Sequence, residues 1–141
     1  MADNAMLKFK TEYDLHCHIA EWLRVKYKGI LFYSDTGSGV RLTIGNSKKM
    51  KRLRETRGYP DVVIFSANGG YHGLAIELKL AGTKIKLCRN DKLYASEHLK
   101  EQAIVLKRFQ KAGYAAGFGV GEKQIKEIID WYLALKGSEY L

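Results

Sequence analysis

The sequence has few of the residues that mark several common classes of protein. It contains one proline among 141 residues and no glycine-rich stretch, which argues against a linker between two domains. Its two cysteines, Cys17 and Cys88, lie far apart without C-x-x-C spacing, so neither a disulfide framework nor a zinc ribbon is indicated. No apolar run approaches the roughly 18 residues of a membrane span, and the first ten residues lack a signal peptide's apolar stretch. We therefore expect a single intracellular domain over residues 1–141.

Acidic residues are scarce relative to basic ones. The chain carries 24 Lys and Arg residues against 15 Asp and Glu residues, which gives a formal net charge of +9. A surplus of this size favours a polyanionic partner, although it says nothing about the fold. Because 46% of the residues are hydrophobic, the chain can bury a core, and a disordered polycation is excluded.

Hydrophobic periodicity and turn signals divide the chain into seven elements. We expect helices over residues 12–28, 96–112 and 122–135, and strands over residues 30–34, 61–65, 71–80 and 115–120. Thr11 and Ser96 are suitable N-caps for the first two helices, and Gly113 is suitable to end the second. The small residues of 115–120 indicate a central strand, and residues 35–57 read as a polar, basic loop. The expected fold is therefore a mixed sheet with flanking helices. The sheet is mixed because a hairpin is antiparallel whereas a β-α-β crossover joins parallel strands.

The hairpin between the second and third strands brings charged residues to one face of the sheet. A three-residue loop, Asn68–Gly70, places Asp61 directly opposite Glu77, with Cβ atoms roughly 4.5–5.5 Å apart. Lys79 shares that face because it lies two residues after Glu77. A two-residue loop would shift the register by one and separate the two acids. Both strands are otherwise almost wholly apolar, so we expect both faces to be covered.

Two facing carboxylates repel each other unless a cation lies between them, and a buried charge is costly unless it is paired or metal-bound. The oxygens of Asp61 and Glu77 suit Mg²⁺ or Mn²⁺, with water in most remaining positions. Lys79 could then hold an attacking water and offset charge that builds on a phosphate. The alternative is that each acid simply pairs with a nearby Lys or Arg.

Two further polar residues lie on helix faces that should dock on the sheet. Glu12 lies within the sector of Leu15 and Ile19, and Gln102 lies on the stripe of Leu99 and Leu106. Alternatively, Glu12 is a carboxylate favoured by the helix dipole, and Gln102 is a satisfied core amide. A histidine-based metal site is not indicated, since neighbouring histidines two residues apart on a helix diverge by about 200°.

These residues together resemble a known nuclease signature. Tyr59-Pro60-Asp61 followed by Glu77-Leu78-Lys79 resembles the P-D…(D/E)-x-K motif of the restriction-endonuclease-like nucleases. With Glu12 opening the first helix and Gln102 ahead of Gly113, the pattern resembles the VRR-NUC branch in particular. The resemblance implies an αβββαβ core with a C-terminal helix and a metal-dependent endonuclease. It also implies the catalytic residues Glu12, Asp61, Glu77, Lys79 and Gln102, with the Leu78 backbone carbonyl, and potentially Glu12, as further metal ligands.

The same resemblance implies branched DNA, such as Holliday junctions or flaps, as substrate, and a homodimer as the active form. A nicking or end-processing deoxyribonuclease without junction preference and a non-catalytic nucleic-acid-binding module are the alternatives. Six cations precede the motif, and their position favours contacts to backbone phosphates over an ordinary solvated charge run. They are Lys48, Lys49, Lys51, Arg52, Arg54 and Arg57.

Overall fold

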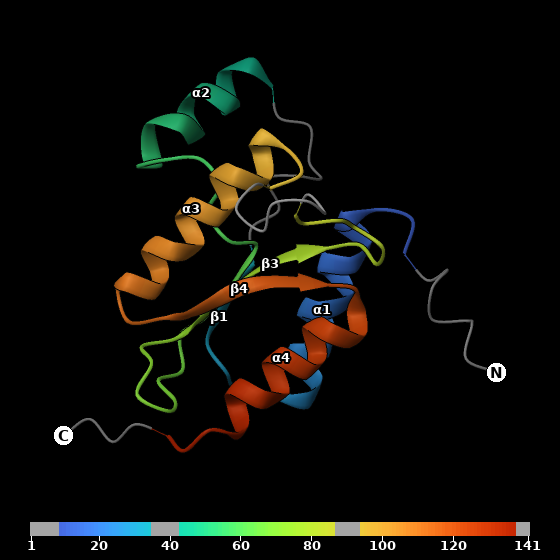
Figure 1. Ribbon diagram of the computed structural model, residues 1–141, viewed down its shortest axis with the longest axis vertical. Helices are drawn as coiled ribbons and strands as arrows, with labels where there is room; N and C mark the ends of the chain where they lie inside the picture. Colours follow the sequence, from blue (N-terminus) through green and yellow to red (C-terminus); the bar gives the residue numbers. More distant parts are fainter. Residues whose placement is uncertain (1–8, 35–42, 87–93, 138–141) are drawn as a thin grey trace.

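The computed structural model describes residues 9–34, 43–86 and 94–137, which form four helices and a four-stranded mixed sheet (Figure 1). The helices are α1 (Glu12–Lys26), α2 (Ile44–Leu53), α3 (Glu97–Lys111) and α4 (Glu122–Ala134). The strands are β1 (Phe32–Ser34), β2 (Val62–Ile64), β3 (Leu74–Lys79) and β4 (Ala115–Val120). This arrangement confirms the α/β class, the antiparallel hairpin and the flanking helices, and it adds one helix, α2.

The helix ends follow from the capping residues. The Thr11 hydroxyl accepts a hydrogen bond from the Asp14 amide at 3.2 Å, and the Ser96 hydroxyl accepts one from the Leu99 amide at 3.2 Å. Both hydroxyls satisfy amides that have no partner within the first turn of a helix. Among the described residues, no helix combines the length and apolar character that a transmembrane segment needs.

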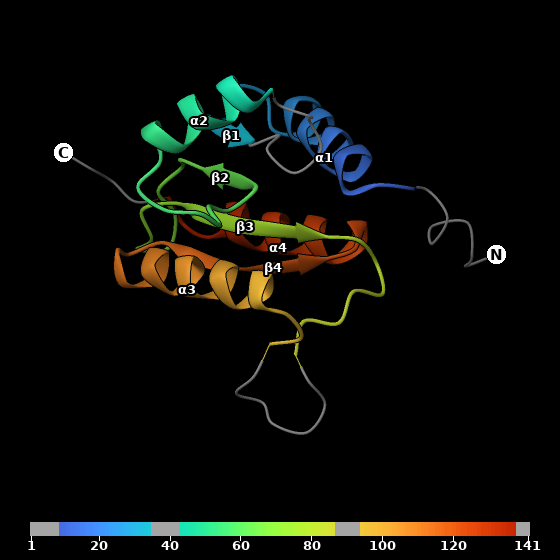
Figure 2. The ribbon, with the colours of Figure 1, turned by 90° about the horizontal axis from the view of Figure 1, so that it is seen from above.

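The strands lie in the order β1-β2-β3-β4, which Figure 2 shows from top to bottom. β2 pairs antiparallel with β3, with Val62 opposite Ile76, and the β3–β4 pair is parallel. This is the register expected for the hairpin, although its tip differs. Asn68 pairs with Tyr71 around a two-residue turn, and one extra residue on the β2 side restores the expected register further along. The regular strands are therefore shorter than expected.

The last strand, β4, lies at the edge of the four described strands, so the expectation of a central strand is wrong. Its small residues instead allow a close approach of α4, because a Cβ added at Gly119 would lie 2.7 Å from Cγ1 of Ile125. Two glutamines cover parts of the open edge. Gln110 donates to the Ala116 carbonyl at 2.9 Å, and Gln124 accepts from the Val120 amide at 2.6 Å.

The two faces of the sheet are covered by different helices. Figure 1 shows α3 and α4 on opposite sides of β4, with α1 beside α4. Alternate residues of β2 and β3 pack with α1 and α4 into the larger apolar core. Its fully buried members are Leu15, Ile19, Leu23, Val62, Ile64, Leu74, Ile76, Leu78, Ile125, Ile129 and Tyr132. The remaining side chains of β3 point to the other face, toward α3.

The basic segment expected to be a loop forms α2 over most of its length. Thr43 caps the helix by accepting a hydrogen bond from the Asn46 amide at 3.1 Å. The helix has no buried residue, and in Figure 1 it lies at the top of the molecule, apart from the sheet. The sequence shows no apolar stripe here because α2 packs no face into the core.

Candidate active site

Asp61 and Glu77 lie where β2 begins, beside the C-terminal half of β3. Because Val62 is opposite Ile76, the next position places Asp61 opposite Glu77, as expected from the sequence. Asp61 is 7% exposed, and its Oδ2 accepts a hydrogen bond from the Leu78 amide at 2.8 Å. Asp61 lies just before the first residue of β2. Its side chain therefore accepts the hydrogen bond from a β3 amide where no backbone carbonyl of β2 does so.

Pro60 explains how a backbone oxygen is left available beside these acids. The same register places Pro60 opposite Leu78, and proline has no N–H to donate. In an antiparallel strand the N–H and C=O of one residue point to the same side, so the Leu78 carbonyl points toward Asp61's strand along with its amide. Pro60 therefore cannot donate a backbone hydrogen bond to the Leu78 carbonyl, and Asp61 supplies a carboxylate beside it.

Glu77 is the most constrained group of the site. It is 3% exposed, and its Oε1 accepts a hydrogen bond from the Gln102 side chain at 2.6 Å, which brings α3 onto the site as expected. Its Oε2 is buried and has no hydrogen-bond partner among the described residues, and the same is true of the Gln102 Oε1. Burial and then the neighbouring Asp61 raise the pKa of Glu77 to about 10, which the Lys79 ammonium only partly opposes.

Lys79 joins the site from the same face of β3. Its Nζ lies 3.9 Å from Oε1 of Glu77 and 3.8 Å from Oε1 of Glu12, and the lysine is 5% exposed. Glu12 opens α1, and its side chain is 35% exposed, so it marks the solvent side of the cluster. The structure thus brings together all five side chains that the sequence singled out for chemistry. They are Glu12, Asp61, Glu77, Lys79 and Gln102.

His16 also belongs to this cluster, and the sequence interpretation missed it. It is 4% exposed, and its Nε2 lies 3.5 Å from Oδ2 of Asp61. The sequence signal was its spacing, since His16 lies four residues after Glu12 and therefore on the same face of α1. The spacing of the histidines argues against a zinc site, and His16 instead faces a carboxylate.

The cations proposed for phosphate contact are exposed on α2 and the residues that follow it. All six, Lys48, Lys49, Lys51, Arg52, Arg54 and Arg57, are exposed. A two-bond ion pair connects this segment to α3, since Arg108 donates to both carboxylate oxygens of Glu55 at 3.0 Å. Tyr59 donates to the same carboxylate at 3.3 Å. The basic segment is therefore fastened to the helix that carries Gln102.

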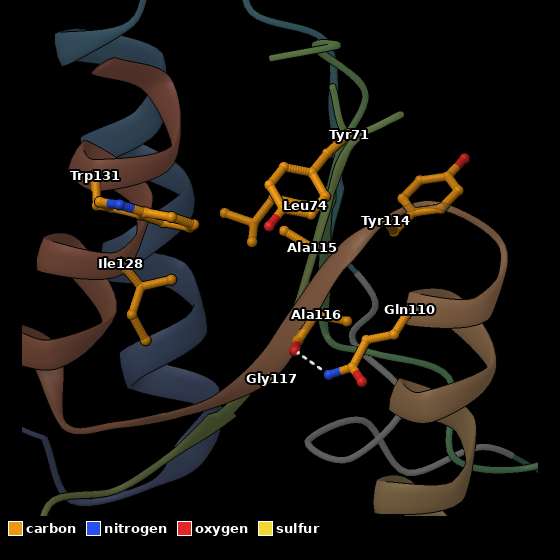
Figure 3. Close-up of a pocket in the computed structure, with 9 residues that line it drawn as sticks. All are labelled: Tyr71, Leu74, Gln110, Tyr114, Ala115, Ala116, Gly117, Ile128 and Trp131. Carbon is orange, nitrogen blue, oxygen red and sulfur yellow. Dashed lines mark hydrogen bonds between the residues drawn. The ribbon is translucent and has the colours of Figure 1, made fainter. Parts of the chain in front are cut away.

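Two cavities lined by described residues lie away from the acids. One, of about 420 Å³, follows the edge of β4 between α3 and α4, where Tyr71, Tyr114 and Trp131 line it without any charged side chain (Figure 3). A second, of about 190 Å³, is lined by Tyr59 and Phe109 among others. Neither contains a candidate catalytic residue, and a site for a polymer need not be an enclosed cavity.

The donor set fits a hard divalent cation held largely by water. Within the described residues, no group of three or more His, Cys, Asp and Glu side chains is arranged to hold a metal ion. Two carboxylates and one carbonyl are nevertheless the usual protein share for Mg²⁺, which keeps several waters. A cation held by Asp61 and Glu77 would give the unpartnered Glu77 Oε2 a partner and would oppose both the burial and the repulsion from Asp61 that raise the pKa of Glu77.

Comparison with solved structures finds a protein similar to this chain. A solved structure described as a "VRR_NUC domain protein" superposes on this chain with a TM-score of 0.65 and 28% sequence identity. The match covers 94% of this chain and 96% of the other. No protein-family model and no curated protein matches the sequence. The similarity therefore extends over nearly the whole of both chains.

Proposed function

Because this chain carries a VRR-NUC domain with the restriction-endonuclease-like fold, we propose that it is a metal-dependent endonuclease acting on DNA. The observation that supports this most directly is the pair of buried, facing carboxylates of Asp61 and Glu77, with Lys79 beside them. Burial raises the pKa of Glu77 to about 10, so keeping an acid at this position costs the fold stability. Polar groups at core positions commonly mark places where function overrides packing.

The proposed cofactor is Mg²⁺ or Mn²⁺, held by Asp61, Glu77 and the Leu78 carbonyl, with Glu12 near enough to contact a bound water. Such an ion supplies Lewis-acid polarisation of the phosphate and lowers the pKa of a bound water. The protein holds the two carboxylates in place beforehand. The Leu78 amide fixes Asp61, and the Gln102 amide fixes Glu77.

Lys79 is proposed to act on the reacting groups themselves. Its ammonium is buried among acids, so it stays close to the position where a scissile phosphate would approach. There it can hold the attacking water by a hydrogen bond and offset the negative charge that builds on the phosphate. In this proposal the two carboxylates bind the metal ion, whereas the lysine acts on the attacking water and the phosphate.

DNA is the proposed substrate, and the α2 segment is its proposed backbone contact. The exposed cations lie on a segment that the Glu55–Arg108 ion pair fastens to α3, the helix that also carries Gln102. Contacts of this kind position a nucleic acid without reading its sequence. Specificity would then come from the shape of the DNA, in keeping with a preference for branched structures.

We further propose that the active form on four-way junctions is a homodimer. Symmetric resolution of such a junction requires two cuts, and the described residues form one carboxylate cluster per chain. Two copies would supply two sites. A nicking or end-processing enzyme without junction preference would need only one.

A cleavage panel tests the proposal. The substrates are linear duplex, flap, splayed-arm and four-way junction DNA, each with Mg²⁺, Mn²⁺ or chelator. We expect cleavage only with a divalent ion, strongest on branched DNA, and a loss of at least ~100-fold in Asp61→Asn and Glu77→Gln. Glu21→Gln, an exposed acid on α1, is the matched control and should cleave normally.

Two results would contradict the proposal. Full cleavage by folded Glu77→Gln protein would exclude the carboxylate pair as the catalytic centre. Tight DNA binding with no cleavage under any metal condition would favour the non-catalytic binding module instead. The buried acids argue against that alternative, because carboxylates facing phosphate weaken binding unless a cation separates them.

A further inference from the structure

His16 is a buried titratable residue that the proposed chemistry does not use. It extends from α1 to Asp61, with its Nε2 at 3.5 Å from the aspartate Oδ2. That nitrogen is buried and has no hydrogen-bond partner among the described residues. We propose that His16 is a positioning residue that holds Asp61 in the orientation needed to bind the cation. This inference rests on the proposed function.

The two oxygens of Asp61 are in different surroundings. Oδ2 already accepts the Leu78 amide at 2.8 Å and is also the oxygen that His16 faces. Once the 3.5 Å separation shortens to a hydrogen bond from His16 Nε2–H, Oδ2 would be held from two sides. The carboxylate can then no longer turn, and Oδ1 is the oxygen left to face a cation. A ligand whose other oxygen is fixed in this way binds a metal more tightly than one free to rotate.

The Nε2 of His16 can serve as a hydrogen-bond donor, and the oxygen that it faces is the Oδ2 of Asp61. The present 3.5 Å separation is long for a hydrogen bond, so we expect it to shorten when an ion draws the carboxylate into place.

Core packing alone does not account for a histidine here. The neighbouring residues of the α1 face, Leu15 and Ile19, are fully buried and apolar, so an apolar side chain would fill the same space. A buried imidazole nitrogen without a partner is costly, and an apolar residue would avoid that cost. The cost is explained if the nitrogen serves Asp61 in the metal-bound state.

The test measures Mn²⁺ affinity by calorimetry in His16→Leu, His16→Gln and His18→Leu. His16→Leu keeps the volume and removes the donor, and we expect Mn²⁺ to bind ~10–100-fold more weakly. His16→Gln restores an N–H near the position of Nε2, and its affinity should return to within about threefold of wild type. His18, on the same helix, pairs with Glu122 at 2.8 Å instead, so His18→Leu should bind Mn²⁺ normally.

Cleavage separates a positioning role from a catalytic one. Since His16 would act only through Asp61, saturating Mn²⁺ should restore the single-turnover rate of His16→Leu. The same concentration should not restore Asp61→Asn, which lacks the ligand itself. A rate that stays low at saturating Mn²⁺ would overturn the positioning role.

The remaining outcomes are equally decisive. Wild-type affinity in folded His16→Leu, or His16→Gln as weak as His16→Leu, would overturn the inference while leaving the proposed function intact. Failure of the wild-type protein to bind Mn²⁺ would overturn the proposed function itself. If His16→Leu does not fold, ¹⁵N NMR of the wild-type imidazole decides. A protonated Nε2 in the Mn²⁺-free protein supports the assignment, and a bare Nε2 overturns it.

Discussion

Strand β3 has two faces that are equally buried and chemically opposite. Leu74, Ile76 and Leu78 are 2%, 1% and 0% exposed, and they pack with α1 and α4 in the apolar core. Glu77 and Lys79, on the other face, are 3% and 5% exposed, and they meet Asp61 and Gln102. Burial alone therefore does not tell which side chains hold the fold together. The same degree of burial stabilises the protein on the apolar face and costs stability on the polar face.

The strain on the polar face can be located atom by atom. Glu77 Oε2 and Gln102 Oε1 are buried without hydrogen-bond partners among the described residues, and the pKa of Glu77 is raised to about 10. Each of these features lowers the stability of the metal-free protein. The apolar face offsets them. A site of this kind can exist only on a strand whose other face is well packed.

The largest expected effect comes from substitutions of neighbouring residues on the two faces. Leu78→Ala removes a fully buried side chain and should lower the free energy of unfolding by about 2–5 kcal/mol. Glu77→Gln should raise it in the metal-free protein, by about 1 kcal/mol or more, roughly 3–5 °C in Tm. The reason is that glutamine removes an ionisable group that folding forces to stay protonated. Thermal unfolding in chelator measures both, and destabilisation by Glu77→Gln would show that the two faces do not differ as described.

The second effect concerns turnover and separates Lys79 from the metal ligands. Lys79→Ala should cleave at least ~100-fold more slowly while still binding Mn²⁺ and DNA, because both carboxylates remain. Lys79→Arg should not restore the rate, since a guanidinium cannot place a compact ammonium on the same water. Calorimetry with Mn²⁺ beside single-turnover cleavage gives the two readouts. Loss of metal binding, or near-normal cleavage, would make Lys79 a structural residue.

The third effect follows from the raised pKa of Glu77. Its folded pKa of about 10 exceeds the ordinary value of 4.5, so the folded protein binds a proton that the unfolded chain releases between these values. The contribution of Glu77 to the stability of the metal-free protein should therefore be most favourable below about pH 4.5. It should become less favourable as the pH rises toward 10. Mn²⁺ must displace that proton, so its affinity should rise by up to about tenfold per pH unit across the window.

Calorimetry in buffers of different ionisation enthalpy measures the proton directly. We expect close to one proton released per Mn²⁺ bound by the wild-type protein at neutral pH. Glu21→Gln, which changes an exposed acid on α1, should release the same number. Binding without proton release would mean that Glu77 is already ionised in the metal-free protein.

Much of this site could be predicted because local rules and the global fold agree there. The register of β2 and β3, the Thr11 and Ser96 caps and the inward positions of Glu12 and Gln102 all follow from spacing. Spacing was informative because each of these residues lies on or beside an element with one buried face. The periodicity of that element then predicted which side chains face the site.

The features that were missed lack that kind of signal. Helix α2 buries no residue, so no apolar stripe distinguishes it from a loop. The edge position of β4 was missed because helices cover both of its faces, which gives it the composition of a central strand. The spacing of His16 from Glu12 places it on the same face of α1, but it was missed because its partner, Asp61, lies on another element, so spacing within α1 does not identify the contact.

The smallest expected effect lies outside both faces of β3, on α2. Neutralising Lys49, Arg52 and Arg54 to glutamine should leave thermal stability unchanged, because none of the three is buried. If each contacts a phosphate of duplex DNA, the slope of log affinity against log salt should fall by roughly 2.7, about 0.9 for each contact. Binding should weaken alike for all sequences, since phosphate contacts carry no base information.

The matched control neutralises Lys28, Lys111 and Lys136, three exposed lysines at or after the C-terminal ends of α1, α3 and α4. Salt titrations of the two triple variants decide the matter. Equal slopes would show that α2 is an ordinary solvated surface, whereas a loss confined to the α2 variant would identify α2 as a phosphate-binding element.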